Sequence, residues 1–219
     1  MRWILGAFLI ILVAACGNNP PPAWIAYQHA DARPGQGLGD LHLGRERLGS
    51  LIEQFGVERV AGWFADEDSG IELIYPSVGL HFMFPMQADC AQATRHLGHR
   101  VIREVYQGHD FLDQYPACRD LRLSSILITD SPRGGWWQGS THGGSKLGDL
   151  WPEVIASHRQ PHHLGPSSLS QAPRVDLEAV LFTEGMTMYF RKVGSGAADA
   201  PDRLLMPLSH IRLYLPEDS

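Results

Sequence analysis

The sequence has little cysteine, no excess of basic charge and no apolar run of membrane-spanning length. Its 219 residues include three cysteines, far fewer than a disulfide-stapled scaffold carries. The 18 lysine and arginine residues are outnumbered by 24 aspartate and glutamate residues, which gives a net charge of −6. This balance argues against a nucleic-acid partner, because nucleic-acid binding depends on a basic surface. The apolar run at residues 3–15 has thirteen residues, fewer than the roughly 20 that a spanning helix needs.

Recognisable catalytic motifs are absent as well. The sequence contains no HExxH metalloprotease motif, no GxSxG nucleophile elbow and no SxxK motif. We therefore predict a protein that is not an enzyme and that holds no cofactor. The search for a function then turns to its address, its architecture and its binding residues.

Residues 1–15 have the features of an export signal, with Arg2 near the start, a short apolar stretch and small residues at the end. The ending VAAC at residues 13–16 resembles the lipobox of bacterial lipoproteins. The resemblance implies that Cys16 becomes the first residue and carries palmitate-type acyl chains that hold the protein to a membrane. Gly17 in place of an aspartate resembles lipoproteins of the outer membrane, which implies a periplasm-facing position. The alternative is an ordinary signal-peptidase site beside Cys16.

Cys90 and Cys118 remain once Cys16 is assigned to lipid. An exported protein meets an oxidising environment, in which a pair of cysteines is expected to be oxidised. We therefore predict a Cys90–Cys118 disulfide that links positions 28 residues apart. A reactive or metal-binding pair is the alternative, and it is less favoured because the two cysteines lack CxxC spacing.

The chain contains an internal repeat. Residues 71–84 align without a gap on residues 177–190, at an offset of 106. Residues 123–128 align on residues 208–213, at an offset of 85. The smaller second offset indicates an insertion in the first copy, at residues 86–120, which contains both Cys90 and Cys118. The sequence therefore predicts two copies of one unit, the first with a disulfide-stapled insertion.

Each copy has the same predicted order of elements. Apolar residues at helical spacing predict amphipathic helices over residues 48–55 and 150–155, and a further helix is predicted near 87–105. Strands are predicted at 57–65, 71–75, 79–84, 121–129, 176–182, 185–191 and 207–215. The expected fold class is α+β: two tandem copies of a helix-then-antiparallel-strands unit, with the helices packed on one sheet face.

Domain boundaries follow from these elements. We predict a signal peptide at 1–15, a lipid anchor and flexible tether at 16–36, a first repeat at 37–130 and a second repeat at 131–219. The tether is inferred from the proline-rich segment 18–22. Long loops are expected at 131–145 and 159–174, and loops of this length in a compact domain are often functional.

The helix-then-hairpin pattern resembles a known module. The residues that carry the resemblance are Leu43-Gly44, Leu51-Ile52, Phe55-Gly56, Tyr75, Gly79-Leu80 and Phe82. The pattern is similar to the module of small bacterial envelope lipoproteins such as the SmpA/OmlA outer-membrane assembly lipoproteins. It is also similar to the beta-lactamase-inhibitor-protein fold, a tandem of such modules. The resemblance covers roughly residues 41–84 and 143–215, and it implies protein binding rather than catalysis.

Two groups of side chains are candidates for a binding site. Trp136 and Trp137 lie in a glycine-rich loop, where adjacent aromatic rings can present rigid apolar area to a partner or stack on a sugar. The alternative is that one ring caps the sheet edge and the other covers it. His158, His162 and His163 are weak candidates for metal ligands, because zinc needs three or four convergent ligands. Exposed histidines without a shared ligand are the simpler interpretation, and no metal is predicted.

The resulting hypothesis is a lipoprotein that contacts the membrane through lipid on Cys16 and binds another envelope protein. Its sheet face or the tryptophan-containing loop would supply the contact. The alternative hypothesis is a periplasmic protein that binds or hydrolyses glycan, or binds a metal, through the tryptophan or histidine loop.

Overall fold

The computed structural model describes residues 22–63, 70–95, 108–130, 136–158, 163–166, 177–182, 185–191 and 206–216. The predicted signal peptide, the lipidation site Cys16 and His162 lie outside the described residues. Within the described ranges, no helix has the length and apolar character needed to cross a membrane.

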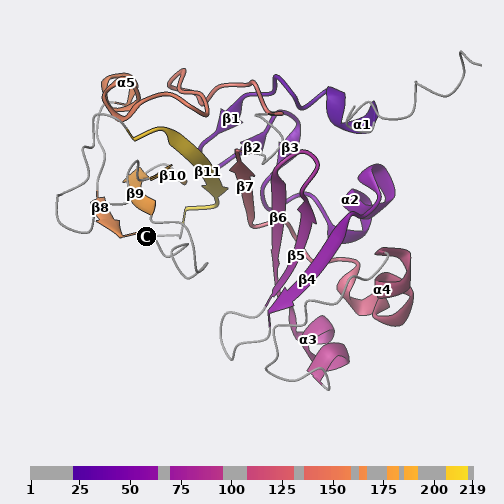
Figure 1. Cartoon of the computed structure of the whole chain (residues 1–219). Coiled ribbons are helices and arrows are strands. Elements are labelled where there is room, and N and C mark those ends of the chain that lie inside the picture. The colour runs from indigo at the N-terminus through magenta and orange to yellow at the C-terminus, as the bar shows by residue number, and fades with distance from the viewer. Residues whose placement is uncertain are drawn as a thin grey trace, which may run out of the picture.

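Two antiparallel sheets form the β structure, and the mixed α+β class is as predicted. The larger sheet has eight strands in the order β4-β5-β6-β7-β11-β10-β9-β8 (Figure 1). Their bounds are β4 Arg59–Trp63, β5 Gly70–Tyr75, β6 Leu80–Pro85, β7 Ser125–Thr129, β8 His163–Pro166, β9 Leu177–Phe182, β10 Met186–Arg191 and β11 Leu208–Tyr214. The smaller sheet contains β1 Ala32–Arg33, β2 Gly37–Leu38 and β3 Leu41–His42.

The described helices are short. They are α1 Pro22–Ile25, α2 Leu48–Phe55, α3 Ala88–Thr94, α4 Gly108–Gln114, the 3-10 helix η2 Pro116–Cys118, and α5 Trp151–Ser157. The amphipathic helices predicted over 48–55 and 150–155 are confirmed as α2 and α5. Gly56 follows the last residue of α2 and has a φ of 69°, which few other residues adopt without strain. Its N–H donates to the Ile52 carbonyl at 2.8 Å.

The seven predicted strands are confirmed as β4 to β7 and β9 to β11. Strand β8 lies within the segment 159–174 that was expected to be a loop, and β1 to β3 were not predicted. β8 has no alternation of apolar and polar residues, and it ends at Pro166. It pairs only with β9 at the edge of the sheet, which is the position where proline is tolerated.

One face of the large sheet forms the core. Paired residues on neighbouring strands point to the same face, and alternate residues along a strand share that face. We call the side that contains Tyr75, Leu80, Ile128, Ile211 and Met188 the inner face, because the register aligns these residues across five strands. All are at most 1% exposed, and the same holds for Ile71, Leu73, Phe82, Phe84, Ile126, Met186, Phe190 and Leu213.

Helices from both halves of the chain pack against the inner face. Trp24 of α1 stacks on Phe55 of α2 with ring centroids 3.9 Å apart and lies 6.0 Å from Phe82 of β6. Trp151 of α5 contacts Phe190 of β10 edge-on at 4.9 Å. The first and second sets of strands are therefore covered on the same side.

The expected flexible tether over 16–36 is wrong for its described part, residues 22–36. Trp24 is fully buried, Tyr27 is 4% exposed, and the segment continues into β1. Trp24 packs on Phe55, and a buried indole contributes a large apolar surface to a core. The proline-rich composition that suggested a tether therefore gives way to core structure within a few residues.

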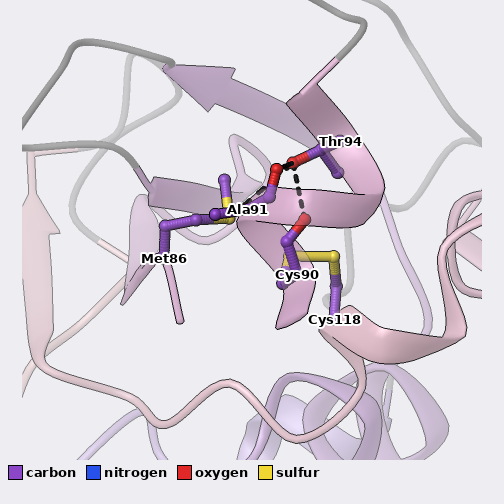
Figure 2. The surroundings of a disulfide bond; sticks show 5 residues. All are labelled: Met86, Cys90, Ala91, Thr94 and Cys118. Atoms are coloured by element: carbon purple, nitrogen blue, oxygen red, sulfur yellow. Dashed lines mark hydrogen bonds between the residues drawn. A yellow bond between two sulfur atoms is a disulfide. The ribbon is translucent and has the colours of Figure 1, made fainter. Parts of the chain in front are cut away.

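The predicted disulfide between Cys90 and Cys118 is confirmed. It joins α3 to η2 within the insertion between β6 and β7, with the two Cα atoms 4.7 Å apart and both residues fully buried. Beside it, the Thr94 hydroxyl donates to the Cys90 carbonyl at 2.7 Å (Figure 2). The helix predicted near 87–105 is present as α3, whereas 96–105 lie outside the described residues.

Candidate functional site

The outer face of the large sheet, opposite the inner face, carries a mixture of polar, aromatic and apolar side chains. The strand register arranges them in three rows. The middle row is Ile74, His81, Leu127, Arg212 and Thr187, and the flanking rows are Glu72, Met83, Ser125 and Tyr214, and Thr129, His210 and Tyr189. Neighbours in a row have Cβ atoms about 5 Å apart, and diagonal neighbours are within reach of longer side chains. Ser125, Leu127, Thr187 and Tyr189 are buried, whereas the other residues of the three rows are partly exposed and form the candidate binding surface.

One diagonal contact pairs Glu72 with His81. The Oε1 of Glu72 lies 2.8 Å from the Nδ1 of His81, and the two side chains are 22% and 25% exposed. The carboxylate of Glu72 thus has a local hydrogen-bond partner. This contact directs the Glu72 carboxylate toward His81 and not toward Arg212.

Arg212 lies in the middle row, on β11, which is one of the two strands at the centre of the sheet. Its Nε donates to the Ser125 hydroxyl at 2.9 Å, across the β7–β11 pairing. On the other side, burial raises the pKa of Tyr189, while the charge and hydrogen bonding of Arg212 act to lower it. Among the described residues, no carboxylate lies within 4 Å of the Arg212 guanidinium.

His210 lies beside this arginine but does not add to its charge. Its Nδ1 is 2.8 Å from the Ser209 hydroxyl, and its ring meets Tyr189 edge-on at 6.4 Å. Burial, followed by the charges of Arg191 and His81, lowers the pKa of His210 from 6.5 to about 4. The imidazole is therefore neutral at neutral pH, and the positive charge at the centre of the outer face comes from Arg212.

These groups suit binding rather than bond making. The terminal guanidinium nitrogens of Arg212 are hydrogen-bond donors directed at no described carboxylate, and a guanidinium matches the geometry of an oxyanion. Ser125, Thr187 and Tyr189 place hydroxyl groups around it and are each at most 3% exposed. The arrangement can hold an anionic group at the centre of a wide, partly apolar surface.

Trp136 and Trp137 present little aromatic area, which favours the structural alternative over the binding candidate. They are 8% and 3% exposed. Trp136 meets Trp24 edge-on at 6.4 Å, and the Trp137 Nε1 donates to the Ala30 carbonyl at 2.9 Å. The rings attach their segment to the N-terminal part of the domain, as in the alternative in which both are structural.

A cleft of about 550 Å³ nevertheless lies beside Trp137. Its lining also includes His29, Asp130, Gln138, Lys146, Leu147 and Gly148. None of the lining residues belongs to the three rows of the outer face, so the cleft is a separate candidate site. Its lining combines charged side chains of both signs with the buried Trp137. It is the feature of the structure most relevant to the glycan hypothesis.

The histidine candidates are not brought together in the described structure. His158 Nε2 lies 3.1 Å from the Ser145 hydroxyl and 3.2 Å from the Thr141 hydroxyl, at the end of α5. His163 begins β8, and His162 lies outside the described residues. The described part of the chain contains no group of three or more histidine, cysteine or acidic residues able to hold a metal ion. The contacts of His158 connect α5 to the loop that contains Thr141 and Ser145.

Comparison with protein-family models, with curated proteins and with solved structures finds no match to this chain.

Sequence reasoning did not single out the outer-face residues, although one signal for them is present. In the predicted strand 207–215, apolar Ile211 and Leu213 alternate with His210, Arg212 and Tyr214. This alternation indicates a second, non-core face. What the sequence lacked was the strand order, which places Arg212 beside Leu127 and Thr187 rather than at an edge.

Proposed function

We propose that this chain is a non-enzymatic lipoprotein, anchored through lipid on Cys16 in the outer membrane and facing the periplasm. In this proposal it binds another envelope protein through the outer face of its large sheet. The observation that carries the binding proposal is the make-up of this face, which exposes part of Met83, Arg212 and Tyr214. Arginine, tyrosine and methionine are the residues enriched in protein interfaces, and arginine and tyrosine dominate their energetics.

The finer fold proposal is that the sheet consists of two copies of one unit. In chain order, α2 precedes β4 to β7 and α5 precedes β8 to β11. The strand order supports this proposal, because each set occupies one half of the sheet and the last strands, β7 and β11, meet at its centre (Figure 1).

The pairing of strands gives further support. Leu80 of β6 pairs with Ile128 of β7. Met186 lies 106 positions after Leu80 and pairs with Leu213, which lies 85 positions after Ile128. Adding the two alignment offsets to this pair of β6 and β7 therefore gives a pair that β10 and β11 form.

Hydrogen bonds outside the ladders also recur, at the offsets of 85 and 106 and, for Gly44 and Gly148, at an offset of 104. The Ser124 hydroxyl donates to the Met83 carbonyl and the Ser209 hydroxyl to the Tyr189 carbonyl, both at 3.1 Å. The Gly44 N–H donates to the Leu123 carbonyl at 2.7 Å. Its counterpart, the Gly148 N–H, donates to the Leu208 carbonyl at 2.8 Å. Matching contacts of this kind favour a shared ancestral unit over two unrelated sets of strands.

The gapless alignment needs one correction, on β9. Tyr75 pairs with Leu80, but its aligned residue Leu181 pairs with Thr187, and Phe182 takes the place opposite Met186. The second hairpin connection is one residue shorter than the first. The offset is thus 106 on β10 and 107 on β9.

The two proposed copies agree on the inner face and differ on the outer face. On the inner face the equivalent pairs are all apolar: Leu80 and Met186, Phe82 and Met188, Phe84 and Phe190, Ile126 and Ile211, and Ile128 and Leu213. On the outer face they are His81 and Thr187, Met83 and Tyr189, Ser125 and His210, Leu127 and Arg212, and Thr129 and Tyr214. Folding requires the first set to be apolar, whereas it leaves the second free to acquire specificity.

The proposed anchor would hold the domain close to the membrane. Trp24, in the core, lies eight positions after Cys16. A chain spans at most ~3.6 Å per residue, so the core would lie within about 30 Å of the lipidated residue. A partner bound by the outer face would then be a membrane protein or another protein held at the same surface.

In vivo crosslinking tests the proposal. The tagged full-length protein is purified from detergent-solubilised envelopes and its partners are identified by mass spectrometry, while the intact mass reports lipid on Cys16. We expect one abundant partner that is lost in Cys16→Ala and in Ile74→Glu, which places a charge on the outer face. Ile25→Glu is the matched control, because Ile25 is 57% exposed on α1, over the inner side of the sheet. Equal recovery of the partner with Ile74→Glu would refute the choice of this face.

A second candidate function is glycan binding in the cleft beside Trp137. The cleft volume of about 550 Å³ and its polar lining favour it. Co-sedimentation of the protein with purified peptidoglycan tests this candidate. Retention that is lost in Gln138→Ala and unaffected by Ile74→Glu would favour glycan over the outer-face proposal.

A further inference from the structure

Arg212 is partly buried and has no carboxylate partner among the described residues, whereas the other described arginines without one, Arg45, Arg95 and Arg122, are exposed. Arg47 and Arg119 each have a carboxylate oxygen 2.5 Å away, and Arg191 has one at 4.0 Å. These three side chains are about half exposed, where an unpaired charge is well solvated. Arg212 has the Ser125 hydroxyl on its Nε and is only partly exposed, in the middle of the sheet. A partly buried, uncompensated charge at this position is costly for the free protein.

The surroundings of Arg212 prepare it for a single carboxylate. The hydrogen bond from Nε to Ser125 fixes the plane of the guanidinium, which also acts on the Tyr189 hydroxyl, and further N–H donors on the terminal nitrogens remain for an incoming group. Leu127, 8% exposed, and Tyr189, 3% exposed, reduce the access of water around it. Glu72 lies on β5, three strands away from β11, and contacts His81 there, so it does not compete for the guanidinium. A doubly charged phosphate would call for more than one cation, and a carboxylate matches one arginine.

We infer that Arg212 is the docking point for an aspartate or glutamate side chain of the partner protein. The inference rests on the proposed function, because a wide sheet face suits a protein surface and the charge of Arg212 defines the complementary group at its centre. Binding would place the carboxylate against the terminal nitrogens, and the partner's apolar side chains would cover Met83 and Tyr214, which are partly exposed. Rim charges tune association rates, whereas a desolvated central pair of this kind controls dissociation.

The test uses the full-length protein in detergent micelles and two probes that differ in one group. The probes are N-acetyl-glutamate amide, which carries a carboxylate, and N-acetyl-glutamine amide, which does not. The side-chain Nε–H resonance of Arg212 is followed by NMR and assigned by its loss in Arg212→Lys. We expect a saturable shift with the glutamate probe alone. The resonance of Arg119, already paired with Glu53, is the internal control. Equal shifts with the two probes, or no shift of Arg212, would overturn the inference.

The same variants are then compared in the crosslinking experiment. Arg212→Gln keeps a side chain able to reach Ser125 but removes the charge, and we expect it to lower partner recovery roughly tenfold to a hundredfold. Arg212→Lys should retain part of the recovery, and Arg119→Gln should retain all of it. Thermal melts establish that each variant is folded.

The two experiments separate the inference from the proposed function. A saturable shift without any captured partner would refute the partner-binding proposal while leaving a carboxylate-binding centre in place. Normal partner recovery with Arg212→Gln would overturn the inference and leave the outer-face proposal standing.

Discussion

The substitution Trp24→Ala tests the least expected feature of the fold, the incorporation of the N-terminal segment into the core. Trp24 is fully buried and contacts aromatic rings from several parts of the chain: Phe55 at 3.9 Å, Tyr75 at 4.7 Å, Phe82 at 6.0 Å and Trp136 at 6.4 Å. Replacing a buried tryptophan by alanine costs about 3–5 kcal/mol, through lost apolar contacts and the cavity left behind.

One term reduces this cost. The Nε1 of Trp24 is buried and has no hydrogen-bond partner. A buried unsatisfied donor costs about 1–3 kcal/mol, and the substitution removes it. We therefore expect a loss of about 3 kcal/mol in the free energy of unfolding, at the lower end of the range. For a chain of this length, each kcal/mol lowers Tm by about 2–4 °C, so Tm should fall by roughly 6–12 °C.

The assay is urea unfolding of the full-length protein in detergent, followed by circular dichroism at 222 nm. Ile25→Ala is the matched control, since Ile25 is adjacent, lies on the same helix and is 57% exposed. Exposed substitutions of this kind change stability by about 0.5 kcal/mol or less. If Trp24→Ala were no more destabilising than Ile25→Ala, residues 22–36 would be the tether expected from the sequence and the reasoning would be refuted.

Two further predictions concern the disulfide and the outer face. The double substitution Cys90→Ala/Cys118→Ala should lower the free energy of unfolding by about 3.6 kcal/mol, from the loop entropy of a 28-residue separation, and an unchanged urea midpoint would contradict this. His210 has a folded-state pKa of about 4 against 6.5 when unfolded, so the unfolded chain binds the proton first as pH falls. Stability should therefore decline between pH 6.5 and 4, by up to about 3 kcal/mol, and His210→Gln should lose this part of the decline; parallel pH profiles of the two proteins would count against it.

Much of the fold could be predicted because its strands show the local signals that sequence reasoning uses. In β5 and β6, Ile71, Leu73, Phe82 and Phe84 alternate with polar or smaller residues, and the helix α2 has a clear apolar face. The strand β8 and the small sheet of β1 to β3 were missed for a physical reason. They are stabilised by pairing with other segments, as where Gly37 and Leu38 meet β1 and β3, and not by a periodic apolar pattern.

The position of Trp24 shows the limit of composition as evidence. Prolines before it suggested an extended tether, yet one large aromatic side chain is sufficient to fold the segment onto α2. For the tryptophans of the 131–145 loop, the glycine neighbours left an exposed and a structural interpretation open. Their burial depends on the N-terminal segment: Trp136 meets Trp24, and Trp137 donates to the Ala30 carbonyl. Neither partner can be inferred from local sequence.

The candidate site could not be predicted because it depends on which strands are neighbours. On the proposed duplication, Leu127 and Arg212 are equivalent residues of the two copies, and they face each other across the central β7–β11 pairing. Leu127 shows that an apolar residue fits this position, at 8% exposure and without an unmet charge. An arginine in the equivalent place brings desolvation that no described carboxylate offsets, so folding alone gives no reason for it. If the outer face had changed in sequence without functional selection, its charged residues would be expected at exposed positions. Ser125, Thr187 and Tyr189 around this arginine are instead buried. This pattern is what the proposed docking of a partner's carboxylate on Arg212 would require.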